Sequence, residues 1–384
     1  MVRIASFNVE NLFARPKAFR GGITEESEKI ISAYEEVNAL FKKQTYTAAD
    51  RQKVIELLAV LDIYHKNSQG AIRRKLTSSP RWAWLRKNRG GFDRQPGNTS
   101  EDIEIIAAGR NDWIGWVELE TEATNEISTR MTAKVIGDPG VNAEILAVVE
   151  AENRPSLLRF NDELLDKKYR HIMLVDGNDP RGIDVGLLTK SGFPIRNIRS
   201  NVDAEDAQGI VFSRDCPEYE VVTPNGTHLY ILVNHFKSQS GGGGAKRKRQ
   251  AKEVRQIVDR LVGESKHVIV LGDFNQGAKP DGSPADNFAD LFDPAGPLVD
   301  AYGLPGFDLG PRLGTFTDCS IRNRLDYILI SQSLVPFFTG GGVFRKGLWG
   351  TRVTRPTAWE TYTEIENGNQ QASDHAAVFV ELTV

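Results

Sequence analysis

Leu271-Gly272-Asp273-Phe274-Asn275-Gln276 follows directly on an apolar, β-branched run that begins at His267. Such a run predicts a fully buried strand that ends at the glycine. Residues two apart in an extended backbone point the same way, so Asp273 and Asn275 would project together from the carboxyl end of this strand. Ligands in layered α/β folds gather at such strand ends. Alone, the stretch is more typical of a strand followed by a polar turn, so a functional reading depends on the other strand ends.

The composition is that of an ordinary soluble globular protein. The 384 residues are 40% hydrophobic and 26% charged, enough to bury a large core. The net charge of -3 excludes a polycation, so nucleic acid would need a local basic patch or a metal ion. Two cysteines, Cys216 and Cys319, build neither a disulfide framework nor a zinc site, and we expect buried free thiols, with one bridge as the alternative.

The chain offers no membrane signal. Its first residues lack the apolar segment of a signal peptide. No stretch approaches the ~20 apolar residues that span a bilayer. We therefore expect a cytoplasmic protein without a membrane partner.

Residues 15–140 differ in character from the rest. Apolar residues at helical spacing over 30–41 and 54–61 predict a largely helical segment. The run 81–89 interleaves basic residues with tryptophans, and Trp113 and Trp116 follow. This pattern is typical of a surface that stacks on bases and neutralises phosphates. The alternative, which we favour, is that the tryptophans are core and the basic residues a solvated face.

The remaining pattern predicts many strands and two helices. Strands are expected at 3–8, 145–149, 171–175, 184–189, 218–223, 227–233, 324–330 and 376–384, and helices at 129–136 and after 246. The segments 281–310 and 340–371 are predicted to be long irregular loops, and loops this long are often functional. No repeat and no linker divides the chain. We expect one domain over residues 1–384, with 15–140 as an insertion.

A basic block, Lys246-Arg247-Lys248-Arg249, opens the helix that follows His235 in the sequence. Such a block can be a solvated helix face or a phosphate clamp, and the sequence leaves both open. The glycines at 241–244 before it lack the spacing of a P-loop.

Polar side chains recur where the predicted strands end. They are Asn8, Glu10, Glu150, His235, Asp273, Asn275, Asp326, Asp374 and His375. The set is rich in oxygen and free of sulfur, which suits Mg²⁺ or Mn²⁺ rather than zinc. It fits metal-assisted attack of water on a phosphate ester, in which carboxylates hold the metal and orient the water. A histidine held by a carboxylate would stabilise the transition state or move a proton.

Six motifs occur in a fixed order. They are Phe7-Asn8-Val9-Glu10-Asn11, Val149-Glu150-Ala151-Glu152-Asn153, Asn234-His235-Phe236-Lys237-Ser238, Gly272-Asp273-Phe274-Asn275, Arg324-Leu325-Asp326-Tyr327 and Ser373-Asp374-His375. In this order the chain resembles the endonuclease/exonuclease/phosphatase superfamily, over residues 1–14 and about 141–384, most of all the pancreatic-deoxyribonuclease-like and bacterial nuclease-like members. The resemblance implies a four-layer α/β sandwich of two mixed β-sheets with the site at one edge, plus the largely helical insertion.

The resemblance also implies roles for the site residues. The catalytic residues would be His235, Asp273, Asn275, Asp326 and His375. The metal ligands would be Asn8, Glu10, Glu150 and Asp374. The substrate-binding residues would be Asn234, Lys237 and Arg249.

Within this set the resemblance makes Glu150 the principal ligand of Mg²⁺ or Mn²⁺, and Asp273 the residue that orients the attacking water. His375 would be the catalytic histidine, with Asp326 as its partner. Two features depart from the family. Val149 stands where a glutamine usually precedes the metal-binding glutamate, and the segment 15–140 is far longer than the usual connection.

The expected function is that of a divalent-metal-dependent phosphodiesterase that hydrolyses nucleic acid. We favour DNA over RNA as its substrate. The alternative within the same chemistry is a phosphatase or phosphodiesterase of a small or lipid-linked phosphoester. A third possibility is an inactive relative that serves as a binding module, and the intact set of site residues argues against it.

Overall fold

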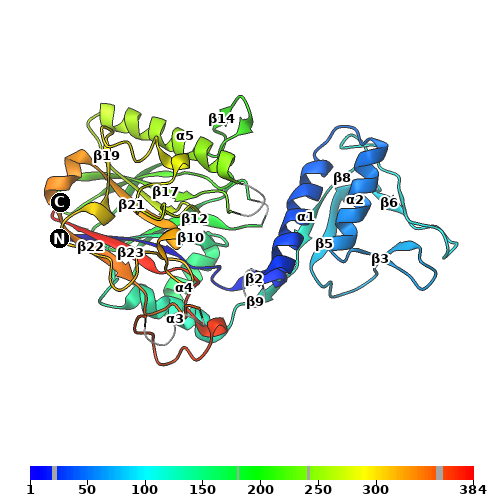
Figure 1. Ribbon diagram of the computed structural model, residues 1–384, viewed down its shortest axis with the longest axis horizontal. Helices are drawn as coiled ribbons and strands as arrows, with labels where there is room; N and C mark the ends of the chain where they lie inside the picture. The colour runs from blue at the N-terminus through cyan, green and yellow to red at the C-terminus, as the bar shows by residue number, and fades with distance from the viewer. Residues whose placement is uncertain (20–23, 180, 240–242, 352–357) are drawn as a thin grey trace. The chain divides into compact units, whose positions relative to one another are not determined.

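The computed structural model in Figure 1 describes residues 1–19, 24–179, 181–239, 243–351 and 358–384. The chain divides into two compact units, one formed by Met1–Phe13 with Thr124–Val384 and the other by Ala14–Ala123. The smaller unit therefore ends before residue 140, and the helix predicted at 129–136 belongs to the larger unit.

The larger unit is built on two mixed sheets. The seven-stranded sheet has the order β11 (His171–Val175), β12 (Asp184–Thr189), β10 (Ile145–Ala151), β1 (Val2–Asn8), β23 (Ala377–Leu382), β22 (Phe338–Phe344) and β20 (Phe307–Asp308). The six-stranded sheet has the order β13 (Ile195–Arg199), β16 (Glu218–Val222), β17 (His228–His235), β18 (His267–Asp273), β21 (Asp326–Ser331) and β19 (Leu298–Asp300). The predicted α/β fold with two mixed sheets is confirmed.

Helices cover the outer faces of both sheets. They are α3 (Glu126–Gly137), α4 (Arg154–Leu164) and α5 (Gly244–Gly263), and a small hairpin pairs β14 (Glu205–Asp206) with β15 (Gly209–Ile210). Short 3-10 helices lie at Asp286–Phe288, Ala301–Gly303, Ile321–Asn323, Gln332–Phe337 and Gly368–Gln370. Among the described residues, no helix combines the length and apolar character needed to span a bilayer.

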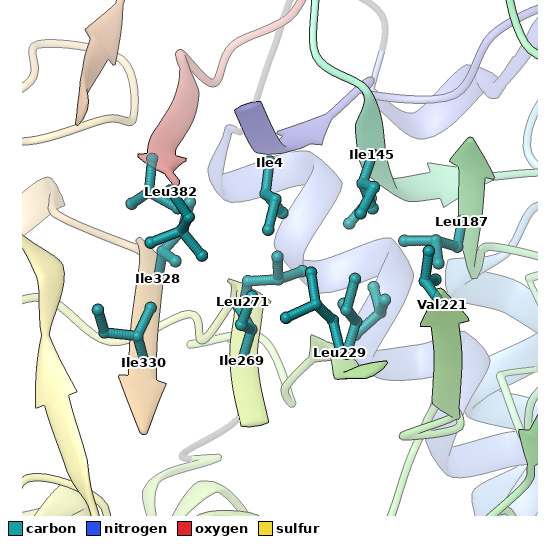
Figure 2. Close-up of a cluster of buried hydrophobic side chains, with 14 of the residues drawn as sticks. Ile4, Ile145, Leu187, Val221, Leu229, Ile269, Leu271, Ile328, Ile330 and Leu382 are labelled. Carbon is teal, nitrogen blue, oxygen red and sulfur yellow. The ribbon is translucent and has the colours of Figure 1, made fainter. Parts of the chain in front are cut away.

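The main core lies between the two sheets. Figure 2 shows Ile4, Ile145 and Leu187 of the seven-stranded sheet facing apolar side chains of β16, β17, β18 and β21. Residues of opposite parity, such as Phe7 and Val148, pack with α3 and α4, while Val268 and Val270 pack with α5. Because successive side chains point to opposite faces, strands buried on both sides appear as continuous apolar runs. The layer order is helix, sheet, sheet, helix.

Two predicted loops contain strands. The segment 340–371 was expected to be irregular, but its first residues belong to β22, which pairs antiparallel with β23. Glycines fill the middle of this strand because a Cβ on Gly341 would lie 2.6 Å from the Phe379 carbonyl oxygen. Strands β19 and β20 likewise lie within 281–310. Residues 352–357 of the long loop are outside the described part of the chain.

The smaller unit is mixed rather than largely helical. Its helices are α1 (Glu25–Phe41) and α2 (Ala48–Val60). Four two-stranded ribbons accompany them, β2 (Ala14–Pro16) with β9 (Thr121–Ala123), β3 (Tyr64–Lys66) with β4 (Ile72–Arg74), β5 (Ala83–Arg89) with β8 (Ile114–Leu119) and β6 (Asp93–Arg94) with β7 (Glu104–Ile105). Strands of two or three residues carry too little periodicity to be predicted. The short 3-10 helix Lys17–Phe19 precedes α1.

The tryptophans of this unit divide between core and surface. Trp113 is buried against Phe41 and Phe92, with ring centroids 4.7 and 4.5 Å away. Trp116 is 39% exposed. The basic residues of 81–89 are largely paired, for example Arg81 with Glu26 and Arg86 with Glu118. The alternative that we favoured, core tryptophans beside a solvated basic face, therefore holds for Trp113 but not for Trp116. Cys216 and Cys319 are buried free thiols, as predicted.

Candidate active site

The strands that carry the predicted site residues end at one edge of the larger unit. Strand β1 runs parallel to β10, and β17 runs parallel to β18, with His235 paired to Asp273. Strand β21 begins opposite the end of β18, so that Asp273 pairs with Asp326. The two sheets meet here, because the Asn8 side-chain amide donates to Asp273 Oδ2 at 3.2 Å.

Gly272 lets the end of β18 lie close to β17. Its φ is +129°, and a Cβ there would lie 2.0 Å from the Asn234 carbonyl oxygen. Any other residue would force the strands apart, which would separate His235 from Asp273. This is the physical reason for glycine before the aspartate.

Asp273 is the centre of the cluster. Its Oδ1 accepts the Asn275 backbone N–H at 2.8 Å, and its Oδ2 accepts the Asn275 side-chain amide at 3.2 Å. The Nε2 atoms of His235 and His375 lie 3.7 and 3.8 Å from the same Oδ2. Burial raises the pKa of Asp273 to about 7, and the neighbouring carboxylate of Asp326 adds to the effect, although His375 opposes it.

His375 and Asp326 form a buried pair. His375 Nδ1 lies 2.8 Å from Asp326 Oδ2, which also accepts the Thr315 hydroxyl at 2.6 Å. Burial alone would lower the pKa of His375, but the carboxylates of Asp326 and Asp273 outweigh it and hold this pKa well above its ordinary value. These carboxylates therefore favour the protonated form of His375.

His235 lies beside Glu150 under the opposite electrostatic influence. Its Nε2 is 3.4 Å from Glu150 Oε1. Burial, reinforced by Arg214 and Arg181, holds the pKa of His235 well below its ordinary value. A neutral imidazole is the form that binds a metal or accepts a proton. The pKa values of the two histidines are thus shifted in opposite directions.

Two groups of side chains could hold a metal ion. One is Glu150, His235 and Asp273, and the other is Asp273, Asp326 and His375, with ligand atoms within 4.8 Å of one another in each group. Two buried atoms of the cluster, Asp326 Oδ1 and His235 Nδ1, have no hydrogen-bond partner among the described residues.

Unusual backbone geometry concentrates here. Four non-glycine residues of this edge have positive φ: Glu10 (49°), Asn11 (59°), Glu150 (65°) and Asn275 (52°). Such conformations cost free energy and persist where surrounding contacts enforce them, often at functional sites. One such contact joins Glu10 to the last motif, since Glu10 Oε2 accepts the Asp374 backbone N–H at 3.0 Å.

Two predicted substrate-binding residues lie outside the cluster. Alternation along β17 puts Asn234 on the face opposite His235, where its amide donates to the carbonyls of Leu232 and Leu271. Arg249 pairs with Asp206 and donates to the Gly209 carbonyl, so its guanidinium holds the β14–β15 hairpin. The sequence shows a polar group but not its partner, so only the structure places these two side chains. Lys237 follows His235 by two residues, and its backbone N–H is bound by Gln250.

Several residues near the site had no local signal. The Thr315 hydroxyl donates to the Asp326 carboxylate, although Thr315 lies eleven positions earlier in the sequence. Arg214 is fully buried, its Nε lies 2.8 Å from Asp179 Oδ2, and its Nη1 donates to the Phe236 carbonyl at 3.1 Å. A single arginine in a loop gives no sign of its distant partners, so only the fold finds these residues.

Two mixed sheets between helices, with carboxylates, amides and imidazoles at one edge, define an α/β enzyme with a hydrolytic type of site. The model of the Endonuclease/Exonuclease/phosphatase family matches residues 91–289, more than half of the chain, and the chain belongs to this family. Members of the family are phosphoester hydrolases that depend on a divalent metal. The acidic and imidazole cluster agrees with that dependence.

Solved structures are similar to part of the chain. A mannosyl-6-phosphatase of Bacteroides thetaiotaomicron has 18% identity and a TM-score of 0.50, over 67% of this chain and 92% of that one. Truncated TDP2 of Caenorhabditis elegans has 15% identity and a TM-score of 0.45, over 67% and 91%. The human nocturnin catalytic domain has 16% identity and a TM-score of 0.46, over 67% and 86%. No curated protein matches the sequence.

Proposed function

We propose that this protein is a divalent-metal-dependent phosphodiesterase that hydrolyses nucleic acid by attack of water on phosphorus. DNA is the substrate that we favour. The observation that carries the proposal is the convergence on Asp273 of the Asn8 amide and the imidazoles of His235 and His375. A hydrolytic site needs groups that hold a phosphate and groups that move a proton, and this cluster contains both.

The donor set fits Mg²⁺ or Mn²⁺. Glu150, Asp273 and Asp326 bring three carboxylates together, and burial raises the pKa of Asp273, with Asp326 and Glu150 adding to the rise. We propose Glu150, with Asn8, Glu10 and Asp374, as the metal-holding side of the site, since oxygen donors suit these ions. A bound divalent ion would polarise the phosphoryl oxygens and offset their charge.

The side chains of the chain itself do the remaining work in this proposal. Asp273, held by Asn8 and Asn275, accepts a proton from the attacking water and fixes its direction. His375, charged and oriented by Asp326, donates hydrogen bonds to the phosphoryl group as negative charge builds there. His235, neutral, contacts the phosphate or the leaving group.

A second candidate is a phosphatase or phosphodiesterase of a small or lipid-linked phosphoester. One observation favours it: the basic block at the start of α5 is largely occupied within the protein. Lys246 donates to the Ile210 carbonyl, Arg247 to the carbonyls of Lys237 and Ser238, and Arg249 pairs with Asp206. Cations engaged in this way are less available to a nucleic-acid backbone.

Salt dependence separates the two candidates. Supercoiled plasmid and bis(4-nitrophenyl) phosphate would be assayed with Mg²⁺ or Mn²⁺ between about 50 and about 300 mM salt. This range includes physiological ionic strength. Nucleic-acid cleavage should weaken steeply with salt, because phosphate contacts release counterions. Cleavage of plasmid that is flat in salt, together with faster turnover of the small ester, would reject the nucleic-acid substrate.

A further inference from the structure

The segment Phe236, Lys237 and Ser238 leaves β17 immediately after His235, and side chains from elsewhere in the fold bind its backbone. The Phe236 N–H donates to the Asp273 carbonyl at 2.9 Å. The Phe236 carbonyl accepts both the Arg214 guanidinium and the Asn275 amide, each at 3.1 Å. These contacts fix the first residue after the histidine.

Two residues of α5 bind the next two residues. The Lys237 N–H donates to Gln250 Oε1 at 2.9 Å. Arg247 Nη1 donates to the Lys237 carbonyl at 3.0 Å and to the Ser238 carbonyl at 2.9 Å. Both side chains are buried, Arg247 at 6% exposure and Gln250 at 0%.

Arg247 also reaches the loop after β18. Its Nε donates to Gln276 Oε1 at 3.1 Å, and Gln276 is the residue after Asn275. The Gln276 carbonyl in turn accepts the Tyr327 hydroxyl at 2.9 Å. One guanidinium therefore ties together the loops that follow His235 and Asp273.

We infer that Arg247 and Gln250 are positioning residues for the active site, which they serve by fixing the backbone next to His235. The inference rests on the proposed hydrolytic function and adds the part of the molecule that keeps the histidine in place. Groups fixed before substrate binds cost no reorganisation during reaction, and a misplacement of about 1 Å can cost about 10² in rate.

The hydrogen-bond geometry at position 247 requires arginine. Two different nitrogens of the Arg247 side chain serve acceptors on two loops. A planar guanidinium holds donors in a fixed fork, whereas a lysine ammonium is a single point on a flexible stem. Lysine at this position would restore part of the attachment at most.

Lys246 provides a matched control. It lies next to Arg247 in α5 and also donates to a backbone carbonyl, but that carbonyl belongs to Ile210 in the β14–β15 hairpin. Both side chains attach a loop to the same turn of helix. Only Arg247 attaches the loops beside the candidate site.

The experiment compares the full-length wild type with Arg247→Ala, Arg247→Lys, Gln250→Leu and Lys246→Ala. Steady-state hydrolysis of bis(4-nitrophenyl) phosphate with Mn²⁺ gives kcat and KM, and thermal unfolding gives Tm. Hydrogen exchange of peptides covering 236–238 reports on the backbone itself. We expect Arg247→Ala to lower kcat at least about tenfold with KM within about threefold. Arg247→Lys should recover part of the loss, and Lys246→Ala should stay within about twofold of wild type in both constants.

The hydrogen-exchange measurement does not depend on catalytic activity. Arg247→Ala and Gln250→Leu should speed exchange in 236–238, while Lys246→Ala should not. Equal kcat in Arg247→Ala and Lys246→Ala, or unchanged exchange, would overturn the inference. If Arg247→Ala does not fold, Arg247→Lys and Gln250→Leu carry the same comparison. If wild type hydrolyses no phosphoester, the proposed function fails, and unchanged exchange would then also reject the positioning of the segment.

Discussion

His375 Nδ1 lies 2.8 Å from Asp326 Oδ2, and the two residues are 6% and 1% exposed. Asp326 lies in β21 and His375 lies in the segment before β23, and these strands belong to different sheets. The pair therefore joins the two halves of the sandwich at the edge where the site lies. Asp326 also raises the pKa of the buried His375.

Replacing His375 with alanine should lower kcat by at least ~10², the usual scale for an acid–base or electrostatic group. The Asp326→Asn variant is the partner experiment, because it preserves shape but removes the charge that raises the pKa of His375. If catalysis needs the imidazolium, wild-type activity falls as pH rises through this raised pKa, and Asp326→Asn moves that alkaline limb to lower pH. A pH–rate profile of kcat checks both, and a loss below tenfold for His375→Ala would remove its catalytic role.

Thr315→Val should weaken the same pair from the other side. The hydroxyl donates to Asp326 Oδ2 and accepts the backbone N–H of Asp326 at 3.2 Å, so its loss leaves buried groups without partners. A buried hydrogen bond to a charged group contributes about 1.5–3 kcal/mol, and we expect a comparable loss of stability in urea with a reduced kcat. Thr315→Ser, which keeps the hydroxyl, should remain close to wild type. Identical behaviour of the two variants would contradict this account.

Asp184 should make stability depend on pH. Burial raises its pKa to about 7, with help from the neighbouring Asp176 and Asp179. Above its ordinary pKa of about 3.8 the unfolded chain releases the proton while the folded chain keeps it, so this group lowers stability as pH rises from about 4 to 7. Asp184→Asn should therefore be more stable than wild type at pH 8, by at least about 1 kcal/mol, and nearly equal at pH 4.

Urea unfolding at the two pH values measures this difference. The amide keeps the oxygen that accepts the Gly177 N–H at 2.8 Å, so the fold loses no hydrogen bond there. An advantage for Asp184→Asn that is larger at pH 4 than at pH 8 would show that the carboxyl is not held protonated.

Two tryptophans of the smaller unit offer a test of its core. Trp113→Ala removes a ring buried against Phe41 and Phe92 and should cost about 3–5 kcal/mol. Trp116→Ala, at an exposed position in β8, should cost less than about 1 kcal/mol. Unfolding followed by fluorescence measures both, and equal costs would reject the division of these residues into core and surface.

Apolar periodicity and the polar residues at strand ends were enough to predict several strands and the grouping of site residues. The bounds of β11 and β12 match the predicted strands. The side chains at the ends of β17 and β18 meet because these parallel neighbours end at one edge, where the antiparallel β21 begins with Asp326. Asn8, at the end of β1, reaches Asp273 from the other sheet. The glycine-rich β22 and the short ribbons escaped because they lack a pattern of apolar side chains. The pairing of Arg249 with Asp206 could not be predicted, because the two residues are 43 positions apart in the sequence.

Metal-dependent hydrolysis with and without Glu150 tests the central proposal most directly. Protein stripped with EDTA would be assayed on supercoiled plasmid and bis(4-nitrophenyl) phosphate, with Mg²⁺ or Mn²⁺ restored, beside Glu150→Gln. We expect no turnover without metal, turnover of at least one substrate with it, and a loss of at least ~10² in the variant. Hydrolysis that needs no metal, or that proceeds equally well in Glu150→Gln, would contradict the proposed site.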